Sequence, residues 1–222
     1  MCNLYSTKQS VDEVRSWFKV TRVNPSAGNL PAQPSIFPAH DAPVVRLADD
    51  GERELTVMKW GFVLPQQGKA PKHVNNCRDD KATTSNFWKA SFRERRCLVP
   101  ASSFAEYHPT ERDEKGRKAI AWFALKGDEP RPPFAFAGLW RSFRGNYKGE
   151  LTEFDTHTIM TTSPNEVVKP IHSTRMPVIL DPSDYETWLA GSPDDAIKLT
   201  KPFSADRMQV AVIGGNQDDW RA

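Results

Sequence analysis

Cys2 stands directly behind the initiator Met1, so removal of one residue would leave a cysteine at the N-terminus of the mature chain. Initiator methionine is commonly removed when a small residue follows it. An N-terminal cysteine carries an α-amino group next to a thiol, and this 1,2-aminothiol captures an aldehyde first as an imine and then as a thiazolidine. The ordinary pKa is about 8 for a free α-amino group and about 8.5 for a thiol, so part of each group is reactive at neutral pH. The alternative interpretation is an incidental cysteine in a frayed terminus.

Two further side chains are candidates for acid–base work. If Phe104 and Glu106 share one face of a strand, the carboxylate points the same way as a core aromatic. An inward-facing glutamate indicates either a buried ion pair or an acid–base role, whereas the opposite register would leave it in solvent. His172 lies between Pro170 and Pro177. This setting predicts a constrained loop that presents the imidazole to a site, and the alternative is a structural histidine bonded to backbone.

Residues that could bind a substrate occur in two short segments. Asn75, Asn76 and Arg78 form a polar cluster, in which the planar guanidinium suits a phosphate; an ordinary polar loop is the alternative. Trp60 ends a predicted strand and is expected either to stack on a nucleic-acid base or to fill the core. The cysteines have neither metal-ligand spacing nor a nearby histidine in sequence, so we expect no metal and no cofactor.

The bulk composition limits the class of protein. The chain has 222 residues, a net charge of +2 and three cysteines. A nearly neutral charge argues against a polycation but allows a local basic groove. Three cysteines cannot pair completely, which favours a reducing cytoplasm, and no apolar run is long enough for a membrane span. We expect one domain over residues 1–222.

The elements that must position these residues are mostly strands. A helix is expected after Ser10, whose spacing to Glu13 matches a capping box, and further helices over residues 86–96, 164–169 and 183–190. A hairpin tip is expected over residues 109–117. Strands are expected over residues 43–47, 55–60, 97–99, 103–107, 118–125, 133–140, 154–162, 176–180 and 208–213. Many strands with few helices predict an α+β fold, built on a curled, antiparallel-rich sheet or barrel.

Taken in order, these residues resemble the SRAP family (SOS-response-associated peptidase, or abasic-site processing proteins). Each motif is short, but their order and spacing behind an N-terminal cysteine are specific. The segments that carry the resemblance are Met1-Cys2, Pro38, Trp60-Gly61, Asn76-Cys77-Arg78, Arg96-Cys97-Leu98-Val99-Pro100, Glu106, Thr161, and His172 with Arg175-Met176-Pro177.

The resemblance implies a role for each matching residue. Cys2 would be the nucleophile and, through its α-amino group, the Schiff-base former. Asn76 would orient the terminal cysteine or the opened sugar, Glu106 would move protons and assist release of Met1, and His172 would act in strand cleavage or adduct reversal. The DNA contacts it implies come from Arg78, Trp60, Thr161 and Arg175. This chain departs from the family pattern at Asn3 and Leu4, and in placing Arg175 three residues after His172.

The resemblance implies a function in DNA repair. The protein would trap the ring-opened aldehyde of an abasic site in single-stranded DNA as a covalent protein–DNA crosslink, after removing its own Met1, and would have lyase or crosslink-reversal activity. It is expected to act as a monomer in the cytoplasm, associated with the nucleoid during DNA damage. Two alternatives stay open: an N-terminal-nucleophile cysteine peptidase, with Cys2 attacking an acyl carbon, and a non-enzymatic single-stranded nucleic-acid binder.

Overall fold

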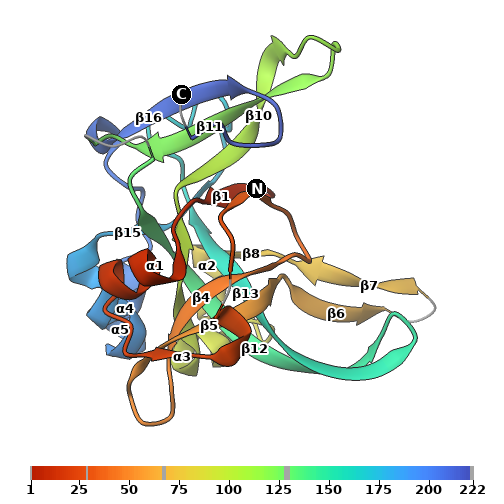
Figure 1. Ribbon diagram of the computed structural model, residues 1–222, viewed down its shortest axis with the longest axis vertical. Coiled ribbons are helices and arrows are strands. Elements are labelled where there is room, and N and C mark those ends of the chain that lie inside the picture. The colour runs from red at the N-terminus through yellow and green to blue at the C-terminus, as the bar shows by residue number, and fades with distance from the viewer. Residues whose placement is uncertain (1, 29, 67–68, 128–130, 221–222) are drawn as a thin grey trace.

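A closed ring of five strands forms the centre of the molecule (Figure 1). The computed structural model describes residues 2–28, 30–66, 69–127 and 131–220. Four antiparallel pairings join neighbouring ring strands. A parallel pairing between the second and the last of the five strands in chain order closes the ring. The ring strands are β4 (Asp41–Leu47), β5 (Arg53–Trp60), β9 (Arg96–Ala101), β12 (Phe134–Tyr147) and β13 (Glu150–Thr162). The expected barrel is therefore present.

A second, five-stranded antiparallel sheet lies beside the ring, in the upper part of Figure 1. We call it the small sheet. Its order across the sheet is β16 (Met208–Gly214), β11 (Lys118–Leu125), β10 (Ser103–Arg112), β1 (Tyr5–Thr7) and β3 (Gln33–Ile36). The small sheet matters for the candidate site because β1 begins three residues after Cys2, while β10 carries Glu106.

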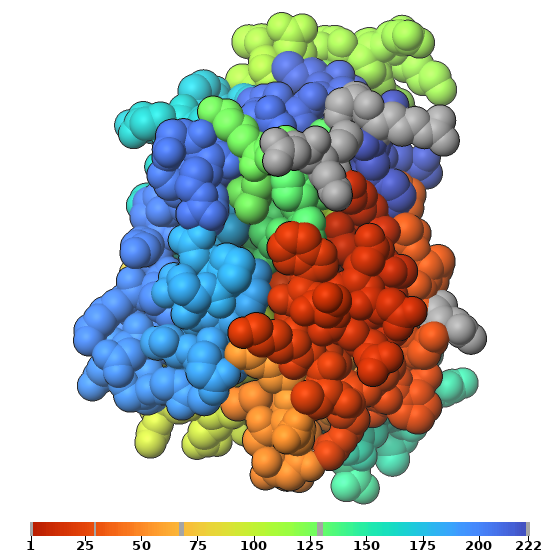
Figure 2. All heavy atoms as spheres, turned by 60° about the vertical axis from the view of Figure 1, so that its left-hand side comes forward, coloured from red at the N-terminus to blue at the C-terminus, as the bar shows by residue number. Residues whose placement is uncertain are grey.

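Short helices and further strands complete the fold. Helix α1 (Val11–Trp17) lies beside the C-terminal helices in Figure 2, and Phe18 stacks on Tyr185 with ring centroids 5.5 Å apart. The other elements are β2 (Arg22–Val23), β6 (Phe62–Gln66), β7 (Lys69–Val74), β8 (Asn76–Arg78), β14 (Met176–Pro177), β15 (Ile179–Leu180), α2 (Asp79–Ala82), α3 (Lys89–Glu94), α4 (Tyr185–Ala190), α5 (Pro193–Lys198) and the 3-10 turns η1 (Pro25–Ala27), η2 (Pro182–Asp184) and η3 (Ala205–Arg207).

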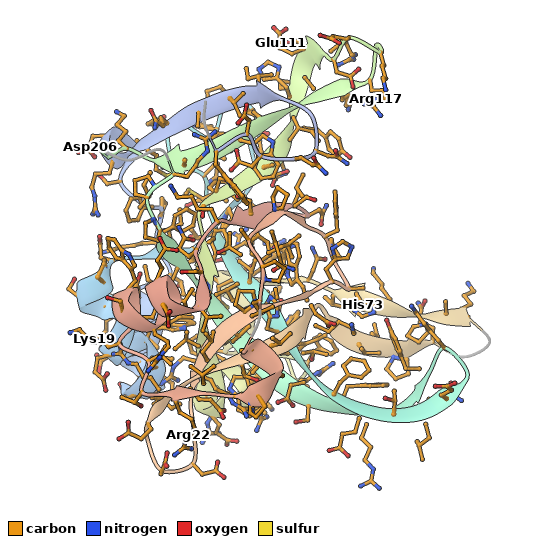
Figure 3. All side chains as sticks on the ribbon, in the orientation of Figure 1. Lys19, Arg22, His73, Glu111, Arg117 and Asp206 are labelled. Carbon is orange, nitrogen blue, oxygen red and sulfur yellow. The ribbon has the colours of Figure 1, made fainter. Side chains whose placement is uncertain are left out.

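The β6–β7 hairpin and the far ends of β12 and β13 extend from the body as an arm (Figure 1). Gly61 makes the bend between β5 and β6 at a φ of 108°, and a Cβ there would lie 2.7 Å from the Cβ of His73. Only glycine fits this left-handed bend without a clash. His73, at the base of the arm in Figure 3, bonds Tyr147 across it.

Alternate residues of the ring strands serve two apolar clusters. One cluster includes Val45 and Leu98 and packs against α1, α3, α4 and α5. The other includes Val44, Val99 and Cys2, and it joins the ring to the small sheet. Because successive strand residues point to opposite faces, both clusters come from the same short strands. The candidate nucleophile is thus part of the apolar contact between the two sheets.

Most of the elements expected from the sequence are present. The capping box forms at α1, where the Glu13 amide donates to the Ser10 hydroxyl and the Ser10 amide donates to the Glu13 carboxylate. The strand over residues 118–125 matches its expected bounds, and the α+β class is confirmed. Strands β10, β12 and β13 run beyond their expected bounds, while α3 is shorter than the helix expected over residues 86–96.

One expectation about local structure is wrong, and two others hold only in part. Residues 164–169 form turns instead of a helix. The buried Asn165 side chain lies where the helix would begin and is held by a distant contact, since it donates to the Phe203 carbonyl oxygen. The helix expected from residue 183 begins as a 3-10 turn and becomes α-helical only at Tyr185. The strand expected over residues 176–180 is split into β14 and β15, which pair with different ring strands.

Candidate active site

Cys2 lies at the entrance to β1 with only 1% of its surface exposed. Its thiol donates to the Leu4 carbonyl oxygen at 3.5 Å, and the same oxygen accepts from the Ala105 amide at 2.9 Å. Met1 lies outside the described residues. A frayed terminus is therefore the wrong interpretation of Cys2, because its side chain is packed and its carbonyl oxygen accepts two hydrogen bonds.

Two asparagine side chains hold the backbone of Cys2 from the opposite side. The amide nitrogens of Asn75 and Asn76 donate to the Cys2 carbonyl oxygen at 3.0 and 2.8 Å. Asn76 lies on β8, which runs parallel to β13 with Asn76 opposite Ile159. The Asn76 side-chain oxygen is buried and accepts no hydrogen bond from the described residues. This oxygen is therefore available as an acceptor beside Cys2.

Glu106 has the inward register that was one of the two sequence interpretations. Phe104 and Glu106 are buried on one face of β10, whereas Tyr107 is 62% exposed on the other. Burial raises the pKa of Glu106 to about 7. A carboxyl group with this pKa exchanges a proton readily at neutral pH, which is the property that acid–base chemistry requires.

Burial also changes the state of the candidate nucleophile. It raises the pKa of the Cys2 thiol far above its ordinary range, and the negative charge of Glu106 raises it further. The expectation of a partly ionised thiol is therefore wrong for the folded chain: desolvation disfavours the thiolate, and the nearest carboxylate repels it. Cys2 is held as a neutral thiol.

His172 lies on the turns between β13 and β14, as its flanking prolines suggested. Its backbone amide donates to the Val168 carbonyl oxygen at 2.8 Å, and its Nδ1 accepts from the Arg175 amide at 3.3 Å. Burial lowers the pKa of the half-buried imidazole, so the ring is neutral at neutral pH. A neutral imidazole whose Nδ1 accepts a hydrogen bond carries its proton on Nε2, so Nε2 is available as a donor.

The two candidate DNA-binding arginines differ in their surroundings. Arg78 forms a two-pronged contact with Asp80 in which the side chains are 53% and 47% exposed. Arg175 pairs with Asp79 at 2.6 Å, and this pair is only 15% and 23% exposed. Exposed ion pairs contribute little stability, so a phosphate can displace Asp80 from Arg78 at small cost. Arg175 is held in a mostly buried ion pair with Asp79.

Trp60 and Thr161 do not have the exposure that their expected DNA contacts require. Both side chains are fully buried. Trp60 donates from its indole nitrogen to the Asn75 carbonyl oxygen at 2.9 Å, and the Thr161 hydroxyl lies 3.4 Å from the Cys77 carbonyl oxygen. A fully buried indole offers no face to a base, so the core interpretation of Trp60 is correct. Both residues support the segment that holds Cys2.

A narrow cleft of about 170 Å³ opens beside Glu106. Its walls are mainly apolar, with Tyr107 exposed at the rim. The cleft is lined by Asn3, Leu4, Phe37, Pro38, Glu106 and Tyr107, among others. A larger hollow of about 700 Å³, lined by Trp17 and Arg53 among others, contains none of the candidate residues. The smaller cleft is therefore the relevant one.

Sequence reasoning missed parts of this arrangement. It placed Asn75 in a polar cluster but did not predict that its amide would reach the carbonyl oxygen of Cys2, 73 positions earlier. It did not predict the ion pairs that Asp80 forms with Arg78 and Asp79 forms with Arg175. Acidic residues directly after a candidate phosphate-binding arginine are the signal that could have predicted these ion pairs.

Fold and site together define an α+β protein whose second residue is a buried cysteine held between two asparagine amides and a glutamate of raised pKa. The model of the SOS response associated peptidase (SRAP) family matches residues 1–216. The chain therefore belongs to the SRAP family.

Named relatives agree with this membership, and a solved structure has the same fold. The abasic site processing protein YoaM of Bacillus subtilis is 30% identical over 219 residues, which cover 96% of this chain and 91% of YoaM. The abasic site processing protein HMCES of Xenopus tropicalis is 30% identical over 177 residues, covering 70% of this chain and 52% of HMCES. A crystal structure of a Bordetella bronchiseptica protein has a TM-score of 0.72 at 24% identity, covering 96% of this chain and 98% of that one, and supports the fold alone.

Proposed function

We propose that this protein processes abasic sites in single-stranded DNA by forming a covalent adduct with them through Cys2. The observation that carries the proposal is the setting of Cys2, buried beside Glu106 with its carbonyl oxygen bonded to two asparagine amides. The names of YoaM and HMCES, both abasic site processing proteins, support the choice of substrate. An abasic sugar is in equilibrium with an open aldehyde, which is the electrophile that an aminothiol captures.

The chemistry has three steps. Hydrolysis of the peptide bond between Met1 and Cys2 consumes one water and exposes the α-amino group of Cys2. The amine then adds to the aldehyde carbon, and loss of one water leaves an imine. Finally the Cys2 sulfur adds to the imine carbon while its proton passes to the imine nitrogen, which closes the thiazolidine. Holding amine, thiol and aldehyde together replaces slow bimolecular encounters, with effective molarities on the order of 10⁵ M or more.

The protonation states suit this order of events. A neutral Cys2 thiol is a poor first nucleophile, so the amine attacks first and the thiol closes the ring afterwards. Glu106 has a pKa of about 7 and is proposed to protonate the hydroxyl group of the amine–aldehyde addition product. The hydroxyl then leaves as water and the imine forms. It is also proposed to activate water for Met1 release. The available side-chain oxygen of Asn76 is proposed to accept from the freed α-amino group.

DNA would approach along the surface that carries Arg78 and the cleft beside Glu106. Arg78 is proposed to bind a backbone phosphate, and the apolar walls of the cleft, with Tyr107 at its rim, would receive a sugar or base next to the lesion. Within the part of the chain that the structure describes, no helix is both long and apolar enough to span a membrane. We further propose that the protein acts as a monomer, as one domain, on DNA at the nucleoid.

Replacing Arg78 by alanine is expected to weaken binding of single-stranded DNA several-fold. The negative slope of log affinity against log salt should become shallower by about 0.7, because one phosphate contact is lost. Binding is measured by fluorescence anisotropy at several salt concentrations. Asp80→Asn serves as the matched control of opposite sign, since it frees Arg78 and removes a negative charge, and should strengthen binding. Both side chains are about half exposed, so folding is little affected. An unchanged salt slope in Arg78→Ala would exclude the phosphate contact.

His172→Ala is expected to slow strand cleavage or adduct reversal by about 100-fold, because a neutral imidazole whose Nδ1 accepts from backbone can donate from Nε2 to an oxygen that gains negative charge. Gel assays on labelled abasic oligonucleotides follow cleavage and reversal, and anisotropy follows affinity. His172→Gln is the matched variant, because its amide preserves polarity without the imidazole's basicity. Loss of DNA affinity equal to the loss of cleavage would assign His172 a structural role.

Intact-mass spectrometry of tag-free protein, alone and mixed with an abasic single-stranded oligonucleotide, tests the whole proposal. The expected result is a chain that lacks Met1 and gains the mass of one oligonucleotide minus one water, in a heat-stable adduct. Loss of Met1 with no adduct, together with turnover of added peptides, would favour a cysteine peptidase. Retention of Met1 with reversible DNA binding would favour a simple single-stranded DNA binder.

A further inference from the structure

A buried carboxylate near the C-terminus ties the strand after Cys2 to the strand that carries Glu106. Asp218 accepts from the Ser6 hydroxyl at 2.9 Å and also from the Ser103 hydroxyl. The two hydroxyl oxygens are themselves 2.7 Å apart. The Asp218 side chain is fully buried, so these bonds are not shared with solvent. Strands β1 and β10 are thus joined through one carboxylate as well as by backbone pairing.

The same carboxylate is fixed by groups from outside these two strands. Arg131 donates to Asp218 from Nε and Nη2 at 3.2 and 3.1 Å, with its side chain 2% exposed. The Asp218 amide donates to the Pro34 carbonyl oxygen of β3 at 3.0 Å. Trp220 donates from its indole to the Ser6 hydroxyl at 3.1 Å. The C-terminal segment therefore lies against β1 as a clamp, here defined as residues 218–220.

The clamp acts where the site is most sensitive to register. Strand β1 has three residues, and its pairing with β3 is irregular between Tyr5 and Thr7. A slip of one residue in a strand turns every side chain to the opposite face. Ser6 lies opposite Ser103 in the β1–β10 pairing. Asp218 bonds both members of that pair, so it holds the pairing in one register.

The register of β1 sets the geometry of the site. With Ser6 opposite Ser103, the Leu4 carbonyl oxygen accepts from the Ala105 amide and from the Cys2 thiol. Glu106 is the next residue along β10. A displacement of β1 against β10 therefore moves Cys2 relative to Glu106.

We propose that Asp218 is a positioning residue for the reaction of Cys2, which it aligns with Glu106 through Ser6 and Ser103. This inference rests on the proposed function, because its readout is adduct formation. Asp218 is far from Cys2 in the sequence and does not touch the reacting atoms. Its effect is on the rate of the bound complex, since Arg78 bonds Asp80 and the cleft beside Glu106 is lined by residues outside the clamp.

The test compares Asp218→Asn with the unmutated full-length protein in single-turnover adduct formation at saturating abasic oligonucleotide. The amide replaces an acceptor oxygen by a donor group that faces the two hydroxyls and Arg131. We expect the saturating rate to fall about tenfold or more, since small misplacements of reacting groups have effects of this size. The affinity for an intact oligonucleotide of the same sequence should stay within about twofold.

Two further variants separate positioning from general destabilisation. Ser6→Ala removes one arm of the clamp while it leaves the Asp218–Arg131 pair in place, and its rate should fall by a smaller factor. Glu54→Gln breaks a comparable buried carboxylate–arginine pair, with Arg46 at 3.0 Å, in the ring of five strands, and its saturating rate should not change. Melting temperatures establish that each variant is folded at the assay temperature; if Asp218→Asn is not, Ser6→Ala decides the question.

The outcomes separate failure of this inference from failure of the proposed function. If the unmutated protein forms no adduct, the proposed function is wrong and the role of Asp218 falls with it. If the unmutated protein forms the adduct and the folded clamp variants match its saturating rate, the positioning role alone is wrong. An equal loss in Glu54→Gln would assign the effect of Asp218→Asn to lost stability and would likewise overturn the proposal.

Discussion

Cys2→Ala protein is expected to form no heat-stable adduct with abasic DNA, while retaining an α-amino group once Met1 has been removed. The imine can still form, but without sulfur it cannot close to the thiazolidine and hydrolyses on heating. Treatment with borohydride during the reaction should reduce the imine and recover a covalent adduct, which denaturing gels and intact mass detect. The variant would thus separate the first covalent step from the second.

Cys97→Ala is the matched control for this experiment. Cys97 is fully buried in the same apolar cluster as Cys2, so both variants lose a packed thiol of equal size. The adduct yield of Cys97→Ala should equal that of the unmutated protein. A chain extended by a tag before Met1 should form no adduct, because no free α-amino group reaches the site. Undiminished stable adduct in Cys2→Ala, or in the tagged chain, would rule out the thiazolidine.

Glu106→Gln is expected to slow adduct formation by a factor of about 10² to 10⁴ and to change its pH dependence. The proposed reaction needs a protonated Glu106, whose pKa is about 7, and an unprotonated amine, whose ordinary pKa is about 8. The rate of the unmutated protein should therefore rise and then fall, with its maximum between about pH 7 and 8. In the variant the fall at alkaline pH should disappear, which leaves a low rate that rises to a plateau.

Glu106→Gln is expected to lower the rate of adduct formation without lowering the melting temperature at alkaline pH. Burial raises the pKa of Glu106 in the folded state above its unfolded value of about 4.3, so the folded chain binds more protons between these two values. Stability contributed by the neutral carboxyl is therefore lost as the pH rises through about 7. Glutamine does not ionise, and Glu106→Gln should melt no lower than the unmutated protein at pH 8. Thermal unfolding at pH 5 and pH 8 checks this, and a variant that melts lower at pH 8 would point to a structural role.

Local rules of sequence account for much of the fold. The capping box at α1 forms because Ser10 and Glu13 satisfy each other's backbone donors within one turn, without distant partners. The strand over residues 118–125 has its expected bounds because it contains branched and aromatic residues, which favour strands. The helix expected over residues 164–169 did not form. The Asn165 side chain contacts residues 38 and 43 positions away, since it donates to the Phe203 carbonyl oxygen and contacts the sulfur of Met208.

The candidate site divides in the same way. The chemistry of the candidates was present in residue type and spacing. Residue 2 is a cysteine, Glu106 follows Phe104 by two positions, and His172 is flanked by prolines. Periodicity could not choose between the inward and outward registers of Glu106, because a strand alternates in both. The pairing of β10 with β1 and β11 decided it.

Only the tertiary structure decided which groups meet and in what state of charge. It buried the Cys2 thiol and raised its pKa, placed the Asn75 and Asn76 amides on the Cys2 carbonyl oxygen, and withdrew Trp60 from solvent. The physical reason is that desolvation and hydrogen bonding depend on neighbours far apart in the chain. Residue types determine what chemistry is available, and the packing of the small sheet against the ring of five strands determines which of those groups can perform it.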